Sequence, residues 1–393
     1  MRILFISHYY PFDTLLFCER YAKVGLDYAA DNLCRSIIQG FELNNCKFDI
    51  INVPNVGSFP VRFKKANMME LHEGNVYSIP FLNIPILKNK FISSNLIKAV
   101  SDWIKHHNDE SLIIVLYSTP NMNFVSAIKK NYPDVKVIII VTDLPQYMAS
   151  GNSRLVATYM KRNSKKNSDT WSLFDGFILL SEKMKDKLPI NGRPCIQMEG
   201  IYNDTYKVDE FDPVAQKVVM YTGNLDERYG LRMLVDAFMD IEDSDMQLWI
   251  RGSGAMKNYI LECCKQDKRI VLLDRMSRYD LIKLQKQATV LVNPVPPSQE
   301  FSKYFFPSKT LEYLASGTAT LMYHLDSIPA DYDEHLYYIE GTNKENLKAS
   351  IVNICGKSKK ELEEHGKAAS KFIMLEKCPQ KQIANLLKFL NKI

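Results

Sequence analysis

The sequence has no long apolar run, and this absence excludes the commonest form of membrane anchor. Nowhere in the 393 residues do about 18 apolar residues follow one another. The opening stretch MRILFISHYYPF has one arginine, a short apolar run and no small-residue cleavage site. Such a stretch is typical of a first β-strand and not of a signal peptide, so we expect a cytoplasmic protein.

Cysteine pairs with metal-ligand spacing are also missing. The eight cysteines are scattered and form no C-x-x-C pair, so neither a zinc site nor a disulfide framework is predicted. No D-x-D pair follows the end of a predicted strand, and we expect neither a metal nor a cofactor. Unpaired thiols suit a reducing cytosol.

The net charge is small, +5, but the charged residues are unevenly distributed along the chain. Residues 1–200 contain 24 Lys and Arg against 18 Asp and Glu, whereas residues 201–393 contain 26 and 27. The positive excess therefore lies entirely in the first half, and we expect that half to meet an anionic partner. An ordinary solvated surface is the alternative.

Short apolar segments alternate with helical patterns along the whole chain. Nearly continuous apolar strands of this kind are typical of parallel sheets that are buried on both faces. The predicted strands are residues 2–7, 47–53, 111–118, 135–143, 176–181 and 194–199, then 217–223, 246–252, 269–274, 289–295, 319–325 and 335–340. We predict an α/β protein made of two doubly wound, Rossmann-like domains that face a central cleft.

The polar segment 202–216 separates the two strand series and is predicted to be an interdomain linker. The first domain is then 1–201 and the second 217–370. We expect the C-terminal helix, 371–393, to pack back toward the first domain. With some 100–200 residues per domain, the chain length agrees with two domains.

Three turns of the second domain carry groups suited to a phosphate. Gly223 follows a strand and lets the backbone approach a ligand, and Arg228 adds a charge at the start of the next helix. Arg251 and Gly252 stand at the next strand end, although the G-S-G there is not the G-x-G-x-x-G dinucleotide fingerprint. A plain turn with surface charges is the alternative for each.

The third turn, FPSKTLEYLASG at 306–317, begins a short helix. Ser308 is predicted to cap it after Pro307. Lys309 lies in the first turn, where the helix dipole disfavours a cation unless an anion is bound. Glu312 lies on the flank of the buried stripe, from which a carboxylate can accept hydrogen bonds from vicinal hydroxyls.

These motifs, in this order and spacing, resemble the donor domain of GT-B glycosyltransferases. The segments YTGNLDERYGLRMLVDAF, RGSG, ATVLVNP and FPSKTLEYLASGT carry the resemblance, which covers about residues 215–345. They are similar to the family-four-like group of retaining enzymes, in particular to bacterial capsule and exopolysaccharide members. Residues 142–145, 175–184 and 199–201 extend the resemblance loosely into the first half.

The resemblance implies a role for each matching position of the second domain. Gly223 faces the diphosphate, Glu312 holds the ribose hydroxyls, and Phe306, Pro307, Ser308 and Lys309 approach the sugar and diphosphate. Arg251 and Gly252 belong to the same donor pocket. The base rests near Met276.

Two departures from the family pattern are visible. Asn224 and Tyr229 stand where the family often has an Arg–Lys pair, and Arg228 is expected to substitute for that lysine. Tyr304 stands where the family has a sugar-contacting glutamate.

In the first domain the resemblance places Gly25 at a helix start that closes over the diphosphate. His8 and Asp143 end predicted strands and are candidates for meeting the acceptor. Structural roles, a core histidine and a turn cap, are the alternatives.

We therefore predict a metal-independent, retaining hexosyltransferase that takes its sugar from a nucleotide-diphosphate sugar, UDP-sugar first. The acceptor is a glycan or lipid-linked glycan of surface polysaccharide, and no nucleic-acid partner is expected. Basic-aromatic segments at 61–69, 86–92 and 159–167 suggest peripheral contact with an anionic membrane, and loops without membrane contact are the alternative. A nucleotide-sugar epimerase of the same fold and a non-catalytic nucleotide-sugar-binding relative are the alternatives.

Overall fold

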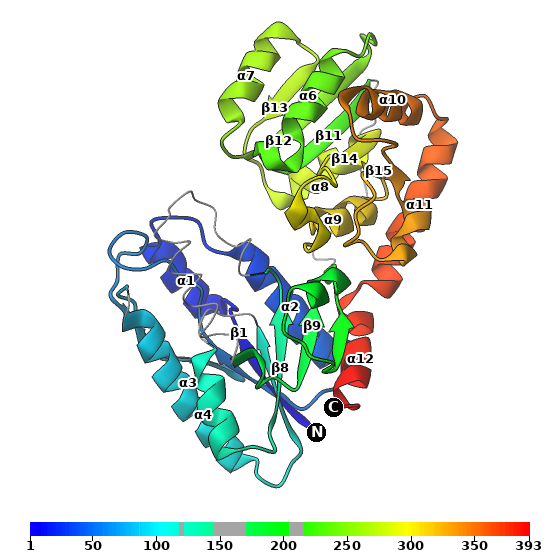
Figure 1. Ribbon diagram of the computed structural model, residues 1–393. Helices are drawn as coiled ribbons and strands as arrows, with labels where there is room; N and C mark the ends of the chain where they lie inside the picture. The colour runs from blue at the N-terminus through cyan, green and yellow to red at the C-terminus, as the bar shows by residue number, and fades with distance from the viewer. Residues whose placement is uncertain (86, 118–121, 145–169, 204–215) are drawn as a thin grey trace. The chain divides into compact units, whose positions relative to one another are not determined.

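The computed structural model describes residues 1–85, 87–117, 122–144, 170–203 and 216–393 (Figure 1). The chain divides into two compact units: unit 1 is Met1–Ile201 with Pro379–Ile393, and unit 2 is Tyr202–Cys378. Most of the predicted linker, 204–215, lies outside the described residues. The boundary that we expected at 370/371 falls inside helix α11 (Lys359–Glu376), and the chain leaves unit 2 only after that helix ends.

Unit 1 is built on an eight-stranded sheet of order β10-β9-β8-β7-β1-β2-β5-β4, parallel throughout except where β4 pairs with β5. Its strands are β1 (Arg2–Ser7), β2 (Phe48–Asn52), β4 (Leu71–Glu73), β5 (Val76–Ser78), β7 (Leu112–Tyr117), β8 (Lys136–Val141), β9 (Gly176–Leu179) and β10 (Cys195–Gln197). Strands β3 (Asn67–Met68) and β6 (Phe81–Leu82) form a separate antiparallel pair. Every residue of β7 is buried, as a strand covered on both faces requires.

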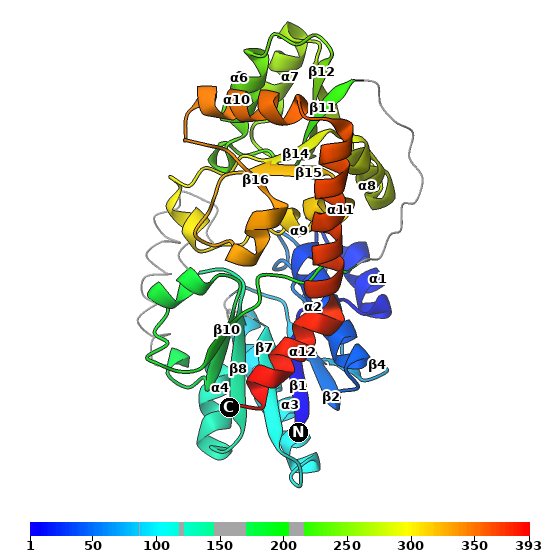
Figure 2. The same ribbon diagram turned by 90° about the vertical axis from the view of Figure 1, so that its right-hand side faces the viewer.

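The helices of unit 1 are α1 (Phe12–Tyr21), α2 (Tyr28–Leu43), α3 (Leu87–His106), α4 (Asn123–Asn131) and the last helix, α12 (Pro379–Leu390). Helix α12 lies beside α2 (Figure 2), and its Ile383, Leu386 and Leu390 join the core of the N-terminal sheet. The Asn44 amide also donates to the carbonyl of Gln380 at 3.0 Å. The apolar stripe of α12 thus gives the chain end its place in unit 1.

Unit 2 contains a six-stranded, all-parallel sheet of order β13-β12-β11-β14-β15-β16. Its strands are β11 (Lys217–Asn224), β12 (Met246–Ser253), β13 (Ile270–Leu273), β14 (Val290–Asn293), β15 (Ala319–Met322) and β16 (Tyr337–Tyr338). Its α-helices are α6 (Leu231–Met239), α7 (Lys257–Gln266), α8 (Arg278–Gln287), α9 (Lys309–Ser316), α10 (Lys344–Cys355) and α11. Because the strand order reverses between β11 and β14, the crevice for a ligand is expected at their carboxyl ends.

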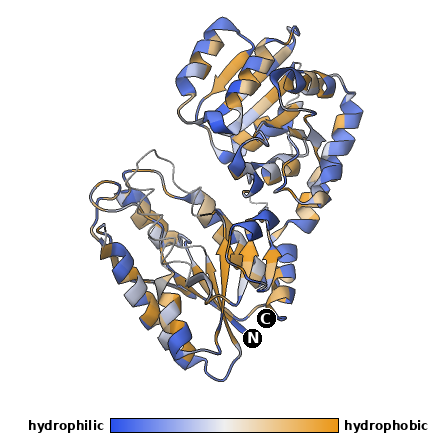
Figure 3. Cartoon of the chain, viewed as in Figure 1, coloured by the Kyte–Doolittle hydropathy of each residue, from blue (hydrophilic) through white to orange (hydrophobic). Residues whose placement is uncertain are grey.

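Apolar side chains concentrate on the strands and the inner helix faces of each unit (Figure 3). In α6 the spacing i, i+3, i+4, i+7 predicts one buried stripe, and the structure confirms it: Leu231, Leu234, Val235 and Phe238 are all fully buried. The buried stripe fixes the orientation of α6 and therefore the position of the turn before it, which contains Arg228.

Candidate functional site

Two glycines lie side by side at the carboxyl ends of β11 and β12. Gly223 pairs in register with Gly252, and a Cβ on Gly252 would lie 1.8 Å from the Gly223 carbonyl oxygen. Gly223 has φ +147°, and a Cβ there would lie 2.7 Å from the Lys309 Nζ. Both positions therefore require glycine, and the lysine ammonium lies directly against the bare backbone of β11.

Lys309 is a half-buried cation held by aromatic side chains. Its Nζ donates to the Tyr221 hydroxyl at 3.2 Å and lies 4.3 Å from the Tyr221 ring centroid and 5.9 Å from that of Tyr229. Burial lowers the pKa of the ammonium to about 8. No carboxylate of the described residues lies within ion-pair distance of it. An anion bound here would offset the cost of desolvating this charge.

Arg228 brings a second cation to the same tyrosine. It belongs to the short 3-10 helix η2 (Glu227–Tyr229), and its guanidinium carbon lies 4.9 Å from the Tyr229 ring centroid. The side chain is 40% exposed, and Asp226, 3.8 Å away, is the one acid that pairs with it in the part of the chain that the structure describes. Arg228 and Lys309 thus converge on one ring, next to the glycine edge of β11. Two cations gathered in this way favour a polyanionic ligand.

Glu312 lies one turn into α9 and is held by two side chains of α8. The Gln285 amide donates to its Oε1 at 2.6 Å, and Arg278 Nη2 lies 2.8 Å from its Oε2. The carboxylate is 19% exposed, and each oxygen retains a second acceptor position. No sequence motif indicated Arg278 or Gln285. Gln285 is a fully buried polar residue on α8, one turn after the buried Leu281.

Tyr313 fixes α9 against β11. Its hydroxyl accepts from the Thr222 backbone N–H at 2.8 Å and donates to the Thr222 carbonyl at 3.1 Å. The ring is fully buried, so this pair replaces part of the sheet's own hydrogen bonding at the strand end. The contact sets the position of Lys309 and Glu312, which stand on the same helix.

The other predicted residues of unit 2 stand at or just after the ends of β11, β12 and β13. Asn224 is exposed, and its carbonyl accepts from the Tyr221 hydroxyl at 2.7 Å. Arg251 is half-buried in register with Thr222. Met276 is half-buried and packs against the core below α8.

The segment before α9 differs from expectation at Ser308. Its hydroxyl makes no capping hydrogen bond, because Ser308 already has helical dihedral angles, φ −51° and ψ −28°, and is exposed. Tyr304, at the end of η3 (Glu300–Lys303), is only 9% exposed. Phe306 packs on Tyr332 with ring centroids 5.7 Å apart, and Pro307 is buried as well. Phe306 therefore directs its ring into the core of unit 2.

The three candidates of unit 1 have dissimilar surroundings. His8 is buried, its Nδ1–H donates to the Val53 carbonyl at 2.7 Å, and its ring meets Tyr117 edge-on. Asp143 is exposed, but neighbouring protein atoms partly desolvate its carboxyl and raise its pKa, and the charge of Asp27 adds to this.

The prediction that Gly25 begins a helix is wrong. Helix α2 starts at Tyr28, because Asp27 caps it by accepting from the Ala30 N–H at 3.2 Å. Gly25 lies upstream in an exposed segment, and a Cβ there would meet nothing within 4 Å. Space alone does not require glycine at this position.

Over the described ranges, no group of three or more His, Cys, Asp or Glu could hold a metal ion. None of the helices seen there has the length and apolarity needed to cross a membrane. All eight cysteines lie in these ranges and are free thiols.

Comparison with known proteins gives a family match for part of the chain. Residues 216–357, from β11 through α10, match the family model "Glycosyl transferases group 1". No curated protein matches the sequence significantly.

Solved structures match over essentially the whole chain. Sucrose-phosphate synthase from Thermosynechococcus elongatus is 13% identical with a TM-score of 0.63, covering 100% of this chain and 99% of its own. The lipopolysaccharide outer core galactosyltransferase WaaB has the same identity, 13%, a TM-score of 0.65 and coverage of 100% and 99%. An E. coli trehalose-6-phosphate protein bound with UDP-2-fluoro glucose is 8% identical, with a TM-score of 0.65 and 99% of both chains covered.

The gathered cations, the glycine edge and the buried glutamate all lie inside the segment that the family model matches. The chain has the two-domain, GT-B-like α/β fold of these structures, and residues 216–357 of unit 2 are the part that matches the glycosyl transferases group 1 model.

Proposed function

We propose that this protein is a glycosyltransferase that moves a hexose-type sugar from a nucleotide-diphosphate sugar to a glycan or lipid-linked glycan. Among nucleotide sugars, a UDP-sugar is the donor that we favour. The observation that carries the proposal is the meeting of Lys309 and Arg228 on the Tyr229 ring beside Gly223. This cluster binds the diphosphate. Its position at the switch point of the sheet in unit 2 is where such folds take nucleotides.

The diphosphate gains negative charge as the glycosidic bond breaks. Lys309 and Arg228 stabilise that charge, because both are already positioned by aromatic contacts before the donor arrives. Bare backbone at Gly223 and Gly252 leaves room for the phosphate oxygens to approach the sheet edge. Removing one such donor group typically costs about 10²–10³ in kcat.

Glu312 binds the ribose. Arg278 and Gln285 each occupy one acceptor position of the carboxylate and hold it in a single orientation. The second lone pair of each oxygen accepts from the 2′- and 3′-hydroxyls.

The acceptor hydroxyl attacks the anomeric carbon as the sugar–phosphate bond breaks, and its proton passes to the departing phosphate oxygen. The sugar retains its anomeric configuration, and the reaction needs neither a metal nor a protein base. In unit 1, Asp143 and His8 orient the acceptor hydroxyl. The raised pKa of Asp143 makes its carboxylate a better hydrogen-bond acceptor for that hydroxyl.

We place the reaction in surface polysaccharide synthesis of a bacterium. WaaB, which acts on lipopolysaccharide, and S. aureus TarM, solved with UDP and a glycerol glycoside, are among the structural relatives and support this assignment.

A thermal-shift panel of UDP-, GDP- and dTDP-sugars tests the donor assignment. We expect one nucleotide class to raise the melting temperature, with a stabilisation of about 2.7 kcal/mol at a hundredfold excess over Kd. The product anomer, read by NMR after transfer to a lipid-linked glycan, then tests retention. If no nucleotide sugar shifts the melting temperature, the proposal fails.

One observation favours a second candidate, a non-catalytic nucleotide-sugar-binding protein. Tyr304 stands at the place of a sugar-contacting glutamate and is nearly buried. Donor binding without turnover in the presence of extracted lipid acceptors would support this candidate over the transferase. An epimerase would instead convert the donor sugar with no acceptor present.

A further inference from the structure

Helix α1 of unit 1 presents apolar residues to solvent on its outer stripe. Phe12, Leu16 and Arg20 follow one another at four-residue spacing, and Phe12 is 73% and Leu16 50% exposed. The opposite side of the helix, with Thr14 and Cys18, is the buried one. A helix that packs on a soluble core normally points polar residues outward, so this stripe needs another explanation.

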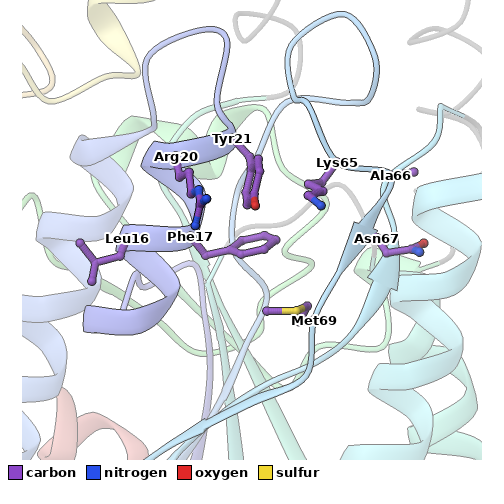
Figure 4. A pocket seen from close by; sticks show the side chains of 8 residues that line it. All are labelled: Leu16, Phe17, Arg20, Tyr21, Lys65, Ala66, Asn67 and Met69. Atoms are coloured by element: carbon purple, nitrogen blue, oxygen red, sulfur yellow. The ribbon is translucent and has the colours of Figure 1, made fainter.

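The stripe borders a hollow of about 630 Å³ (Figure 4). Leu16, Phe17, Arg20 and Tyr21 of α1 line one side of the hollow, and the segment 65–69 lines the other. Met69 of that segment is 53% exposed. We call Phe12, Leu16, Arg20, Lys65 and Met69 the α1 face.

The α1 face rests on a fixed support. Ala22, just after the helix, pairs with Phe63 in an antiparallel bridge, and the Lys64 N–H donates to the Tyr21 carbonyl at 2.8 Å. Phe63 is fully buried and its ring contacts that of Tyr21. The two sides of the hollow are therefore tied together, and the exposed apolar groups keep a defined geometry.

The two charged residues that line the hollow, Arg20 and Lys65, are both cations. They extend over the Tyr21 ring, at 5.5 Å and 4.9 Å from its centroid. Acids lie outside the lining: residues 12–24 and 61–73 together carry five cations and four acids, and Glu73 accepts hydrogen bonds from the Asp13 and Thr14 backbone N–H groups. Long cationic side chains that cover apolar surface and keep their charge in water suit a boundary between apolar and polar phases.

We propose that the α1 face docks unit 1 on an anionic lipid bilayer. Phe12, Leu16 and Met69 enter the boundary between headgroups and acyl chains, and Arg20 and Lys65 meet the lipid phosphates. Apolar residues rimmed by cations match a bilayer better than a protein, because protein interfaces are depleted of lysine. A soluble glycan gives no reason to expose phenylalanine and leucine on one helix stripe.

This assignment uses the predicted segment 61–69 and adds α1, which the charge pattern had not indicated. The predicted segment 159–167 lies outside the described residues and takes no part in the argument. Docking does not depend on the proposed transfer reaction, since binding to vesicles is measured without donor or acceptor. Failure of one therefore leaves the other standing.

Vesicle flotation with the full chain tests the docking. One vesicle is pure phosphatidylcholine, and the other is an equal mixture with phosphatidylglycerol. We expect binding to the anionic vesicles only, weakened by NaCl. Leu16→Glu should abolish binding, and Lys65→Gln and Arg20→Gln should each lower the partition coefficient about fivefold, since each cation near an anionic surface contributes about that factor.

The controls are on α7 of unit 2, at positions of similar exposure. Leu261→Glu, at a leucine that is 41% exposed, and Lys265→Gln, at a lysine that is 70% exposed, should leave vesicle binding unchanged. Far-UV circular dichroism checks that Leu16→Glu folds. If it does not, Phe12→Ser, at the most exposed apolar position of α1, gives the same test.

Four results would overturn the proposal. One is equal binding of the wild type to both vesicles or to neither, and another is retention of binding by both Leu16→Glu and Phe12→Ser. The third is a dimer in sedimentation that Leu16→Glu dissociates, because the α1 face would then belong to a second copy. Competition by soluble glycerol phosphate would likewise assign Arg20 and Lys65 to a free phosphate.

Discussion

Both units are built on a mainly parallel sheet, but the candidate side chains at the ends of their strands are held to different degrees. In unit 2 the candidate groups are already held: Lys309 by two tyrosine rings, and Glu312 by Gln285 and Arg278. The candidates of unit 1 are mixed: His8 is buried and bonded to the Val53 carbonyl, whereas Asp143 is exposed and Gly25 has open space around it. A site whose groups are all held before its ligand arrives suits one invariant ligand, such as a nucleotide diphosphate. Exposed groups such as Asp143 suit a variable acceptor.

A glycine-to-alanine pair tests this contrast most severely. Gly252→Ala puts a Cβ 1.8 Å from the Gly223 carbonyl oxygen, whereas Gly25→Ala meets nothing within 4 Å. We expect Gly252→Ala to lower the free energy of unfolding of unit 2 by about 3 kcal/mol or more, because the clash is with backbone that cannot move aside. Gly25→Ala should change stability by about 0.5 kcal/mol or less. Urea unfolding measures both, and equal effects would contradict the contrast.

Removing the cation beside Gly223 should have the next largest effect. Lys309→Met keeps much of the apolar stem but removes the ammonium, so we expect a loss of about 100-fold in kcat and weaker UDP binding. Its matched control is Lys257→Met, at an exposed lysine that begins α7. Calorimetric titration with UDP and a transfer assay measure the two quantities. If Lys309→Met and Lys257→Met behave alike, the diphosphate does not bind at Lys309.

Removing the Glu312 carboxylate should have a smaller effect, one confined to the binding of the ribose. Glu312→Ala removes hydrogen bonds from a charged acceptor, each worth about 1.5–3 kcal/mol, so we expect UDP affinity to fall about tenfold or more. The wild type should bind UDP more tightly than its 2′,3′-dideoxy analogue, and Glu312→Ala should not discriminate between them. Glu262→Ala, at an exposed ion pair of α7, is the control. If Glu312→Ala still binds UDP more tightly than the dideoxy analogue, the ribose does not bind at Glu312.

The strands of both units could be predicted from the sequence, because each is a short and nearly continuous apolar run. The short strands β3 to β6, within 67–82, were missed, since two or three residues of mixed polarity carry no period. In the site, turn chemistry and resemblance pointed to Gly223, Lys309 and Glu312. Gln285 could not be found in this way, because its bond to Glu312 crosses 27 residues and depends on how α8 packs on α9.

The smallest effect that we predict is a pH dependence of UDP binding to unit 2. Burial lowers the pKa of Lys309 to about 8, whereas a bound diphosphate raises it, so donor binding takes up a proton above that pH. UDP affinity should therefore fall about fivefold from about pH 7 to 9, where the phosphates, with a pKa near 6, are already ionised. The stability of the protein without UDP should change in the opposite direction, rising with pH. The unfolded chain holds the Lys309 proton up to its ordinary pKa of 10.5, so Lys309 contributes stability that rises from about pH 8 to 10.5. Lys309→Arg, which stays charged throughout, should bind UDP with a flat profile, while Lys257→Arg keeps the wild-type slope. If the UDP affinity of Lys309→Arg still falls with pH, another group is titrating, and Lys309 does not bind the diphosphate.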